Sequence, residues 1–188
     1  MDTNENTLSD WQEIDATPAR DTAEIDELRQ ALVDASKLWL AHDGLWFLAW
    51  EKRHGIDEAI EGDTEAWDKF ARLEAKRIMA RLGLKPGGGI DALARCFKNR
   101  LYSNICRFTM YKRGDNQLRL RMNECRVQDA RHRKQLPPFP CKSVGIVEFT
   151  NFATTVDERV QVECLQCPPD DPTPGGWCEW VFTIPEES

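Results

Sequence analysis

The sequence contains no apolar run that approaches the ~18 residues needed to span a membrane, and its amino terminus is acidic and polar, unlike a secretory signal peptide. We therefore expect a cytoplasmic protein without a membrane partner. The formal net charge of −7 at pH 7 argues against general binding to nucleic acid. Internal repeats and linker-like segments are also absent, so a chain of 188 residues predicts one domain.

Two common ligand-binding motifs are missing or incomplete. The glycine run at residues 87–89 is not followed by Gly-Lys-Ser/Thr, which excludes a phosphate-binding loop and indicates a flexible joint. Cys164 and Cys167 form one C-x-x-C pair, but the second pair of a zinc ribbon is absent. The odd total of seven cysteines leaves at least one thiol unpaired, and disulfides are rare in the cytoplasm. The cysteines therefore indicate a metal site, catalysis or simple packing.

Charge is distributed unevenly along the chain. Residues 1–27 carry nine acids and one base, and we expect residues 1–20 to be a disordered acidic leader ahead of a single domain at residues 21–188. Residues 112–135 carry eight bases and three acids. Such a basic segment can bind a carboxylate or phosphate group, although a solvent-exposed helix face is the commoner reason for a run of basic residues.

Apolar residues at helical spacing predict three helices in the first half of the chain. The first begins near residue 21 and ends at Gly55, either as one long helix or as two helices jointed at Gly44. The second covers residues 63–82 and the third residues 90–99. Steps of three and four residues alternate along a seam of the first helix, which predicts its core-facing side: Ile25, Leu28, Leu32, Ala35, Trp39, His42, Trp46 and Ala49.

Period-two alternation predicts two β-hairpins in the second half. In the first hairpin, residues 104–112 and 117–124, Leu120 lies on the core side and Arg119 faces solvent. A short basic helix at residues 127–135 follows, and Pro140-Cys141 begins another helix.

The second hairpin pairs residues 160–167 with residues 177–184, and its three cysteines lie at the open end. We expect Trp180 and Phe182 to be buried against the long first helix. The order of elements predicts an α+β domain, in which the two hairpins form one antiparallel sheet with helices packed on one face.

The cysteines are candidate zinc ligands, because thiolates bind zinc in tetrahedral sites. His132 is an alternative fourth ligand. The opposing interpretation is that the thiols only pack as small apolar side chains, as we expect for Cys96 and Cys106. The predicted metal-binding set is Cys125, Cys141, Cys164 and Cys178.

Cys141 is also the candidate nucleophile. It lies at the start of a predicted helix, where the helix dipole favours the thiolate, and His42 would be its general base; a buried structural thiol is the simpler explanation. His42 and Glu74 are both predicted to point into the helical core, as in a pocket with few polar groups among aromatic side chains. The predicted catalytic residues are Cys141, His42 and Glu74, and the predicted ligand-binding residues are His42, Asp43, Trp46 and Glu74.

Three segments carry a resemblance to known families: His42-Asp43-Gly44-Leu45-Trp46-Phe47, Phe139-Pro140-Cys141-Lys142, and Glu163-Cys164 with Trp177-Cys178-Glu179-Trp180. They resemble an uncharacterised family of bacterial and archaeal cytosolic proteins, which is similar to the L-2-amino-thiazoline-4-carboxylic acid hydrolase family. A more distant resemblance is to the small-molecule-binding domain of the 4-vinyl reductase type, related in fold to transport-particle subunits.

The resemblance covers about residues 25–184 and implies the fold and a small-molecule pocket near the cysteines. Cys125, Cys141 and Cys178 match the cysteines of the hydrolase-like pattern. Glu163 and Cys164 match the acid and thiol of the vinyl-reductase-like pattern, but here they are adjacent rather than spaced.

Three functions follow as hypotheses. The first is a domain that binds a small molecule, with zinc as a candidate cofactor. The second is a hydrolase acting on a small cyclic C–N or C–S compound, such as an amino-thiazoline carboxylate. The third is a structural or partner-binding protein whose cysteines only pack, and a homodimer is compatible with each of them.

Overall fold

Two β-hairpins form one four-stranded antiparallel sheet with the strand order β1-β2-β4-β3. The computed structural model describes residues 19–21, 23–171 and 175–186. The predicted disordered leader, residues 1–20, lies almost entirely outside these ranges. The strands are β1 (Arg107–Arg113), β2 (Gln117–Glu124), β3 (Gln161–Gln166) and β4 (Cys178–Thr183).

The central strands β2 and β4 bring the two hairpins together in the register that the alternation predicts. Leu118 pairs with Phe182 and Leu120 pairs with Trp180, and all four side chains are buried. Arg119 lies on the opposite face and is exposed, so the predicted strand register is confirmed. A slip of one residue would have exchanged the two faces.

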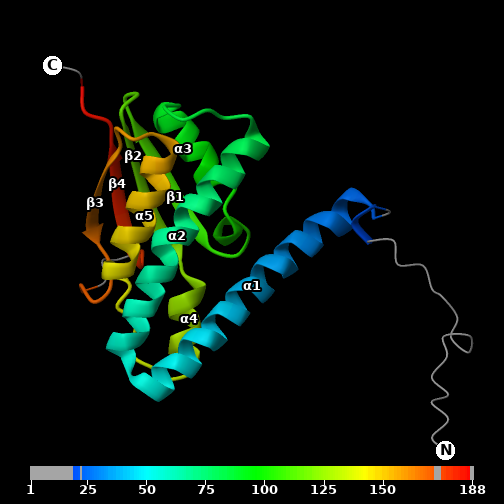
Figure 1. Ribbon diagram of the computed structural model, residues 1–188, viewed down its shortest axis with the longest axis vertical. Coiled ribbons are helices and arrows are strands. Elements are labelled where there is room, and N and C mark those ends of the chain that lie inside the picture. Colours follow the sequence, from blue (N-terminus) through cyan, green and yellow to red (C-terminus); the bar gives the residue numbers. More distant parts are fainter. Residues whose placement is uncertain (1–18, 22, 172–174, 187–188) are drawn as a thin grey trace, which may run out of the picture.

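Five α-helices in the described residues accompany the sheet, and those that contact it cover one face (Figure 1). The predicted α+β class is confirmed. α3 and α5 contact the sheet, α2 packs beside α5, and α1 packs on α2. The helices are α1 (Ile25–His54), α2 (Ile56–Leu82), α3 (Gly89–Phe97), α4 (Arg126–Arg133) and α5 (Lys142–Val156), with short 3-10 turns η2 (Ala19–Asp21) and η3 (Leu101–Asn104).

Local signals explain where the long helices begin and end. Glu24 and Glu27 form a capping box at the start of α1. Gly55 separates α1 from α2, and Gly83 ends α2 in the left-handed conformation that glycine adopts without strain. α1 continues through Gly44 without a joint. α2 begins at Ile56, seven residues before the predicted start at residue 63, because no residue after Gly55 interrupts this second helix.

The predicted core seam of α1 is wrong. Ile25, Leu32 and Trp46 are 66%, 50% and 66% exposed, and Ser36 is the buried residue of this helix among those described. Figure 1 shows the reason: the amino-terminal half of α1 projects away from the other elements. Only the later part of α1 contacts the body, through Trp39, which stacks on Phe70 with ring centroids 5.7 Å apart.

The core lies between the sheet and the helices α3 and α5. Trp180 and Phe182 are buried, as predicted, but their neighbours are α5 and α3 rather than the long helix. Phe149 lies 4.7 Å from Trp180, and Phe97 lies 5.0 Å from Phe182, between ring centroids. Two aromatic rings at such distances contribute beyond the apolar area that they bury.

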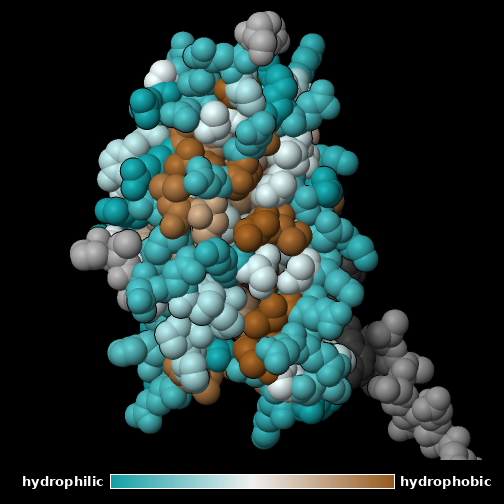
Figure 2. Space-filling model, turned by 90° about the vertical axis from the view of Figure 1, so that its left-hand side faces the viewer, coloured by the Kyte–Doolittle hydropathy of each residue, from teal (hydrophilic) through white to brown (hydrophobic). Residues whose placement is uncertain are grey.

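Figure 2 shows the side of the molecule where β3 and α5 lie, and apolar side chains form a broken band along the middle of this face. Exposed apolar residues of the elements on this side include Ile146 of α5 and Leu165 of β3. None of the described helices combines the length and the apolar character that a membrane span requires.

Candidate functional site

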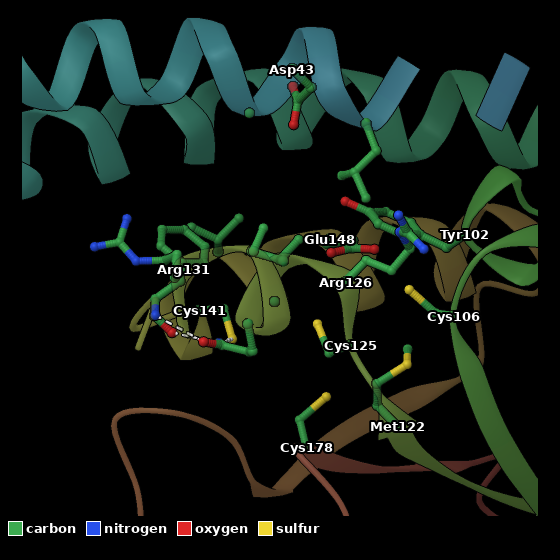
Figure 3. A pocket seen from close by; sticks show the side chains of 18 of the residues that line it. Asp43, Tyr102, Cys106, Met122, Cys125, Arg126, Arg131, Cys141, Glu148 and Cys178 are labelled. Carbon is green, nitrogen blue, oxygen red and sulfur yellow. Dashed lines mark hydrogen bonds between the residues drawn. The ribbon is translucent and has the colours of Figure 1, made fainter. Parts of the chain in front are cut away.

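A cavity of about 450 Å³ lies between α1, α4 and the inner face of the sheet. Its size falls within the range of pockets that hold small molecules. Figure 3 shows α1 along one side of the cavity and the strands on the other, with side chains from both directions pointing into the space between them. Residues from all five α-helices and from β1, β2 and β4 line it, together with η3 and the loops beside it.

Aromatic and aliphatic side chains form most of the lining. They come from segments far apart in the sequence, so the cavity exists only in the folded chain. Most of these side chains are themselves packed in or against the core, which holds the wall in place. The aromatic and larger aliphatic residues of the lining are Leu40, Leu45, Phe47, Leu48, Trp67, Phe97, Tyr102, Phe108, Leu120, Val127, Phe139, Val144, Phe149 and Trp180.

One wall of the cavity is rich in sulfur (Figure 3). Cys106, Met122, Cys125, Cys141 and Cys178 all line it. Burial raises the pKa of the Cys106 thiol and raises the pKa of the Cys125 thiol further. These two thiols are therefore neutral near pH 7 and behave as small apolar side chains.

Cys141 differs from the other thiols. It immediately precedes α5. Gln128 Nε2 donates a hydrogen bond of 3.5 Å to its sulfur, and the Cys167 sulfur lies 3.5 Å away, within hydrogen-bond distance. The Cys167 thiol is the main cause of a lowered pKa for Cys141, and Gln128 adds to it while burial opposes it. The contact with Cys141 is also the main cause of a raised pKa for Cys167, and the Cys178 thiol adds to it, so Cys141 is the first of the pair to lose its proton.

Carboxylates occupy the opposite side of the cavity. Asp43, Asp63 and Glu148 line it, and Figure 3 shows Asp43 on α1, across the open space from the labelled sulfur atoms. Burial raises the pKa of Asp63 to about 7, and the nearby Asp43 and Glu148 add to the shift because like charges repel. Burial also raises the pKa of Glu148. Asp63 therefore changes its charge near neutral pH, where an exposed carboxyl is already ionised.

Arg100 supplies a buried positive charge behind Glu148. Its Nη2 lies 2.8 Å from Glu74 Oε2 and 2.7 Å from Glu148 Oε1. The guanidinium also lies 4.7 Å from the centroid of the Phe152 ring, a cation–π contact. Glu74 is thus buried as predicted, and its partner is Arg100.

Glu74 is absent from the cavity lining, and His42 does not point into the core. The expectation that His42 and Glu74 share one core is therefore wrong for His42, which is exposed. Its Nε2 accepts a hydrogen bond of 3.3 Å from Nε1 of the exposed Trp46. Of the four predicted ligand-binding residues, Asp43 alone lines the cavity. The structure supplies Cys141 with Cys167 and Gln128 as partners in place of an imidazole.

The predicted zinc ligands are not brought together as one set. Cys125, Cys141 and Cys178 line the cavity, whereas Cys164 lies in β3 opposite Trp180 and is not part of the lining. Within residues 19–21, 23–171 and 175–186, no three His, Cys, Asp or Glu side chains are grouped in a way that could hold a metal ion. The alternative ligand His132 is exposed. These residues do not fit a zinc site.

One ion pair of the basic segment joins two walls of the cavity; we call it the Arg131–Glu51 latch. Arg131 donates to both carboxylate oxygens of Glu51, at 2.9 and 3.0 Å, and thereby ties α4 to the end of α1. Such bidentate pairs fix geometry as well as charge. Arg131 is buried, so it belongs to the structure of the site rather than to a solvated helix face.

Several site residues escaped the sequence reasoning. Gln128 and Asp63 carry no local pattern that marks them, and the C-x-x-C spacing marks Cys167 as a candidate metal ligand but not as the partner of Cys141, which lies 26 positions away. Glu148 had one usable signal: it is an acid within the otherwise apolar helix that begins after Cys141. A carboxylate in such a position needs a partner when it is buried.

Comparisons with other proteins give one family and two distant structures. The pattern described as "Family of unknown function (DUF6125)" matches residues 22–184. A crystal structure of the phenol-responsive sensory domain of the transcription activator PoxR with phenol is 13% identical, with a TM-score of 0.49, over 77% of this chain and 73% of that one. No significant match came from the curated proteins.

The second structure is a trafficking protein particle complex subunit 3 from Naegleria fowleri, covalently bound to palmitic acid. It is 11% identical, with a TM-score of 0.46, over 82% of this chain and 96% of that one. At these values neither structure assigns a ligand or an activity to this chain.

Proposed function

We propose that this chain, which belongs to a family of unknown function (DUF6125), binds a small and largely apolar molecule in the cavity beneath α1. The observation that carries the proposal is the cavity itself: about 450 Å³, lined by aromatic and aliphatic side chains and by a few polar groups. A cavity of this kind is the usual form of a small-molecule site.

The side chains that line the cavity favour a largely apolar ligand that carries a few hydrogen-bonding groups. The neutral thiols of Cys106 and Cys125 offer apolar contact, whereas Asp63 and Glu148 offer hydrogen bonds on the opposite side. Because burial raises the pKa of Asp63 to about 7, this carboxyl can donate as well as accept a hydrogen bond.

Binding of N-phenyl-1-naphthylamine, a neutral apolar dye whose fluorescence rises in apolar surroundings, tests the proposal. Val144 lines the cavity and Val147, one turn along α5, does not. We expect the wild-type chain to bind the dye at one site. We expect Val144→Phe, which fills the cavity, to weaken binding at least ~10-fold, the equivalent of about 1.4 kcal/mol.

Val147→Phe is the matched control and should bind the dye as the wild type does. Leu48→Phe, which enters the same cavity from α1, is the second filling variant, and circular dichroism verifies that each variant folds. The proposal fails if the wild-type chain does not bind the dye, or if both filling variants bind it with unchanged affinity.

A second candidate is the hydrolase, with Cys141 as nucleophile. Cys141 lines the cavity, accepts a hydrogen bond from Gln128 and touches the Cys167 thiol, and both contacts favour its thiolate, as an activated thiol requires. Hydrolysis of L-2-amino-thiazoline-4-carboxylate tests this candidate. If the reaction occurs, Cys141→Ser should abolish it and His42→Ala should leave it unchanged, because His42 is exposed outside the cavity. Absence of hydrolysis removes this substrate while leaving dye binding untouched.

A further inference from the structure

Cys141 and Cys167 hold their sulfur atoms 3.5 Å apart at the wall of the cavity. Both residues line it, so a molecule in the cavity can reach them. They are separated by 26 positions in the sequence: Cys141 directly precedes α5, and Cys167 directly follows β3.

A clasp of three polar contacts holds the two thiols in this position. Lys142 Nζ lies 2.8 Å from Asp170 Oδ2, and the Lys142 backbone N–H donates to the Pro168 carbonyl at 2.9 Å. The backbone N–H of Cys167 donates to Asp170 at 3.2 Å. The approach of the sulfur atoms is thus built into the backbone and does not depend on flexible side chains alone.

We propose that Cys141 and Cys167 form a thiol pair that hydroperoxides oxidise to a disulfide. The Cys141 thiolate attacks one oxygen of the hydroperoxide, the O–O bond breaks, and the remaining oxygen leaves as an alcohol or water after taking a proton. Cys141 is then a sulfenic acid. The Cys167 sulfur attacks it, the S–S bond forms, the S–O bond breaks, and water leaves with the Cys167 proton. Two thiols lose two electrons, and the hydroperoxide gains them.

The geometry assigns a separate role to each cysteine. Cys141 precedes a helix of 15 residues, accepts a hydrogen bond from Gln128 and lies in contact with the Cys167 thiol, which suits the attacking thiolate. Cys167 is buried and touches Cys141, which suits the resolving thiol. The apolar cavity admits an organic hydroperoxide as readily as hydrogen peroxide.

Mass spectrometry of the reduced chain after treatment with one equivalent of cumene hydroperoxide tests the proposal. We expect a loss of two hydrogens and one crosslinked peptide pair that contains Cys141 and Cys167. Iodoacetamide should label Cys141 at least ~10-fold faster than Cys96 before oxidation, the difference expected for one unit of pKa, and should not label it afterwards.

Two variants separate the roles. Cys141→Ser should prevent the crosslink, and Cys167→Ser should leave a sulfenic acid on Cys141 that dimedone traps. Cys96→Ser, which changes a buried thiol outside the cavity, is the control and should crosslink as the wild type does. A bridge from Cys167 to Cys178, or oxidation of Cys141 no faster than that of Cys96, would overturn the proposal.

A second, independent inference comes from α1. Its apolar seam is exposed along most of the helix, from Ile25 and Leu32 in the projecting half to Trp46 in the half that packs on the body, and Trp50, one turn beyond Trp46, is exposed as well. Residues 24–32 are all exposed. An isolated helix is marginally stable in water, so a helix that projects with an apolar stripe requires a partner surface.

The charges on α1 indicate which partner fits. The first turn carries Asp26 and Glu27, and the last turn carries Lys52 and Arg53. The seam alternates steps of three and four residues, which is the spacing of helices that pair with one another. An antiparallel copy of the same helix therefore matches both the apolar stripe and the charges at its ends.

We infer that two copies of the chain pair through antiparallel α1 helices. A twofold axis near the middle of α1 places Leu28 and Leu32 of one copy beside Trp46 and Trp50 of the other. The same axis places the acidic first turn of each α1 beside the basic last turn of its partner. The length of α1, about 45 Å for 30 residues, provides the long contact that a stable dimer needs. The opposite side of α1 lines the cavity, so dimerisation would also support one wall of the site.

Sedimentation equilibrium tests the dimer. We expect twice the chain mass for the wild type at micromolar concentration and a single chain for Leu28→Glu with Leu32→Glu. Leu38→Glu is the matched control: Leu38 is 70% exposed on the same helix but lies outside the seam, and this variant should stay dimeric.

Charge reversal tests the orientation. Asp26→Lys with Glu27→Lys should weaken the dimer at least ~10-fold, or about 1.4 kcal/mol, and adding Lys52→Glu with Arg53→Glu should restore it. A monomeric wild type, or a Leu28/Leu32 variant as dimeric as the wild type, would refute the pairing. Failure of the second reversal to restore the dimer would refute the antiparallel orientation.

Discussion

Gly145 and Trp180 pack against each other so closely that a Cβ atom on Gly145 would stand 2.8 Å from Cζ2 of the indole. Gly145 lies in the first turns of α5, and Trp180 lies in the central strand β4. The missing side chain lets the helix approach the sheet at this point. The contact thereby positions the start of α5, where Cys141 and the cavity lie.

Gly145→Ala should destabilise the fold, although alanine favours helices. The added methyl must displace a fully buried indole, and overpacking of this kind typically costs ~1–3 kcal/mol. Urea unfolding measures the change. Gly62→Ala is the matched control, since Gly62 lies within α2 with open space around it; it should stabilise the chain by about 0.5–1 kcal/mol. Equal effects of the two substitutions would contradict the close packing.

Arg100→Met should destabilise the chain by about 3–5 kcal/mol, because it leaves the buried carboxylates Glu74 and Glu148 without their shared positive charge. The loss should be smaller at pH 5 than at pH 8, since an unpaired carboxyl can be protonated at lower pH. Urea unfolding at both pH values measures it. Arg95→Met, which changes an exposed arginine of α3, should change stability by less than ~0.5 kcal/mol.

Asp63 should make the stability fall as the pH rises through the neutral range. Its pKa in the folded chain is about 7, above the usual 3.8, so between these values the folded state binds more protons than the unfolded state. The free energy of unfolding then decreases with pH, by at most about 1.4 kcal/mol per pH unit for one group. The carboxylates whose pKa is lowered, such as Asp157 and Asp170, act in the opposite sense below pH 4.

Urea unfolding between pH 4.5 and pH 7.5 checks this slope. Asp63→Asn should make it shallower, because asparagine does not titrate. Asp68→Asn, an exposed carboxyl one turn along α2, serves as the control and should keep the slope of the wild type. A slope unchanged by Asp63→Asn would show that this carboxyl titrates normally.

The Arg131–Glu51 latch should contribute to both stability and binding. Arg131→Met should destabilise the chain by roughly 1–3 kcal/mol, because it leaves the Glu51 carboxylate unpaired, and should weaken dye binding by loosening α4 against α1. In a double-mutant cycle with Glu51→Gln, the two losses should not add, since both substitutions remove the same interaction. Additive losses would indicate that the two residues act independently.

Local patterns in the sequence determined most of the secondary structure. The alternation of Leu118 and Leu120 with Arg119 predicted the strand and its inward face, since successive residues of a strand point to opposite sides. Gly55 and Gly83 marked helix ends for a similarly local reason. The position of Cys141 at the start of a helix was also predictable, because Pro140 precedes it.

Only the tertiary structure determines which apolar helix faces are buried in the core and which residues distant in the sequence contact each other. The seam of α1 predicts an apolar contact, but spacing cannot distinguish the core of the same chain from the surface of a second copy. Arg100 contacts Glu148, and Cys141 contacts Cys167. The residues of each pair are too far apart in the sequence for helical or strand periodicity to indicate the contact. Such pairs depend on how the helices pack on the sheet, and this packing is determined by the whole core at once.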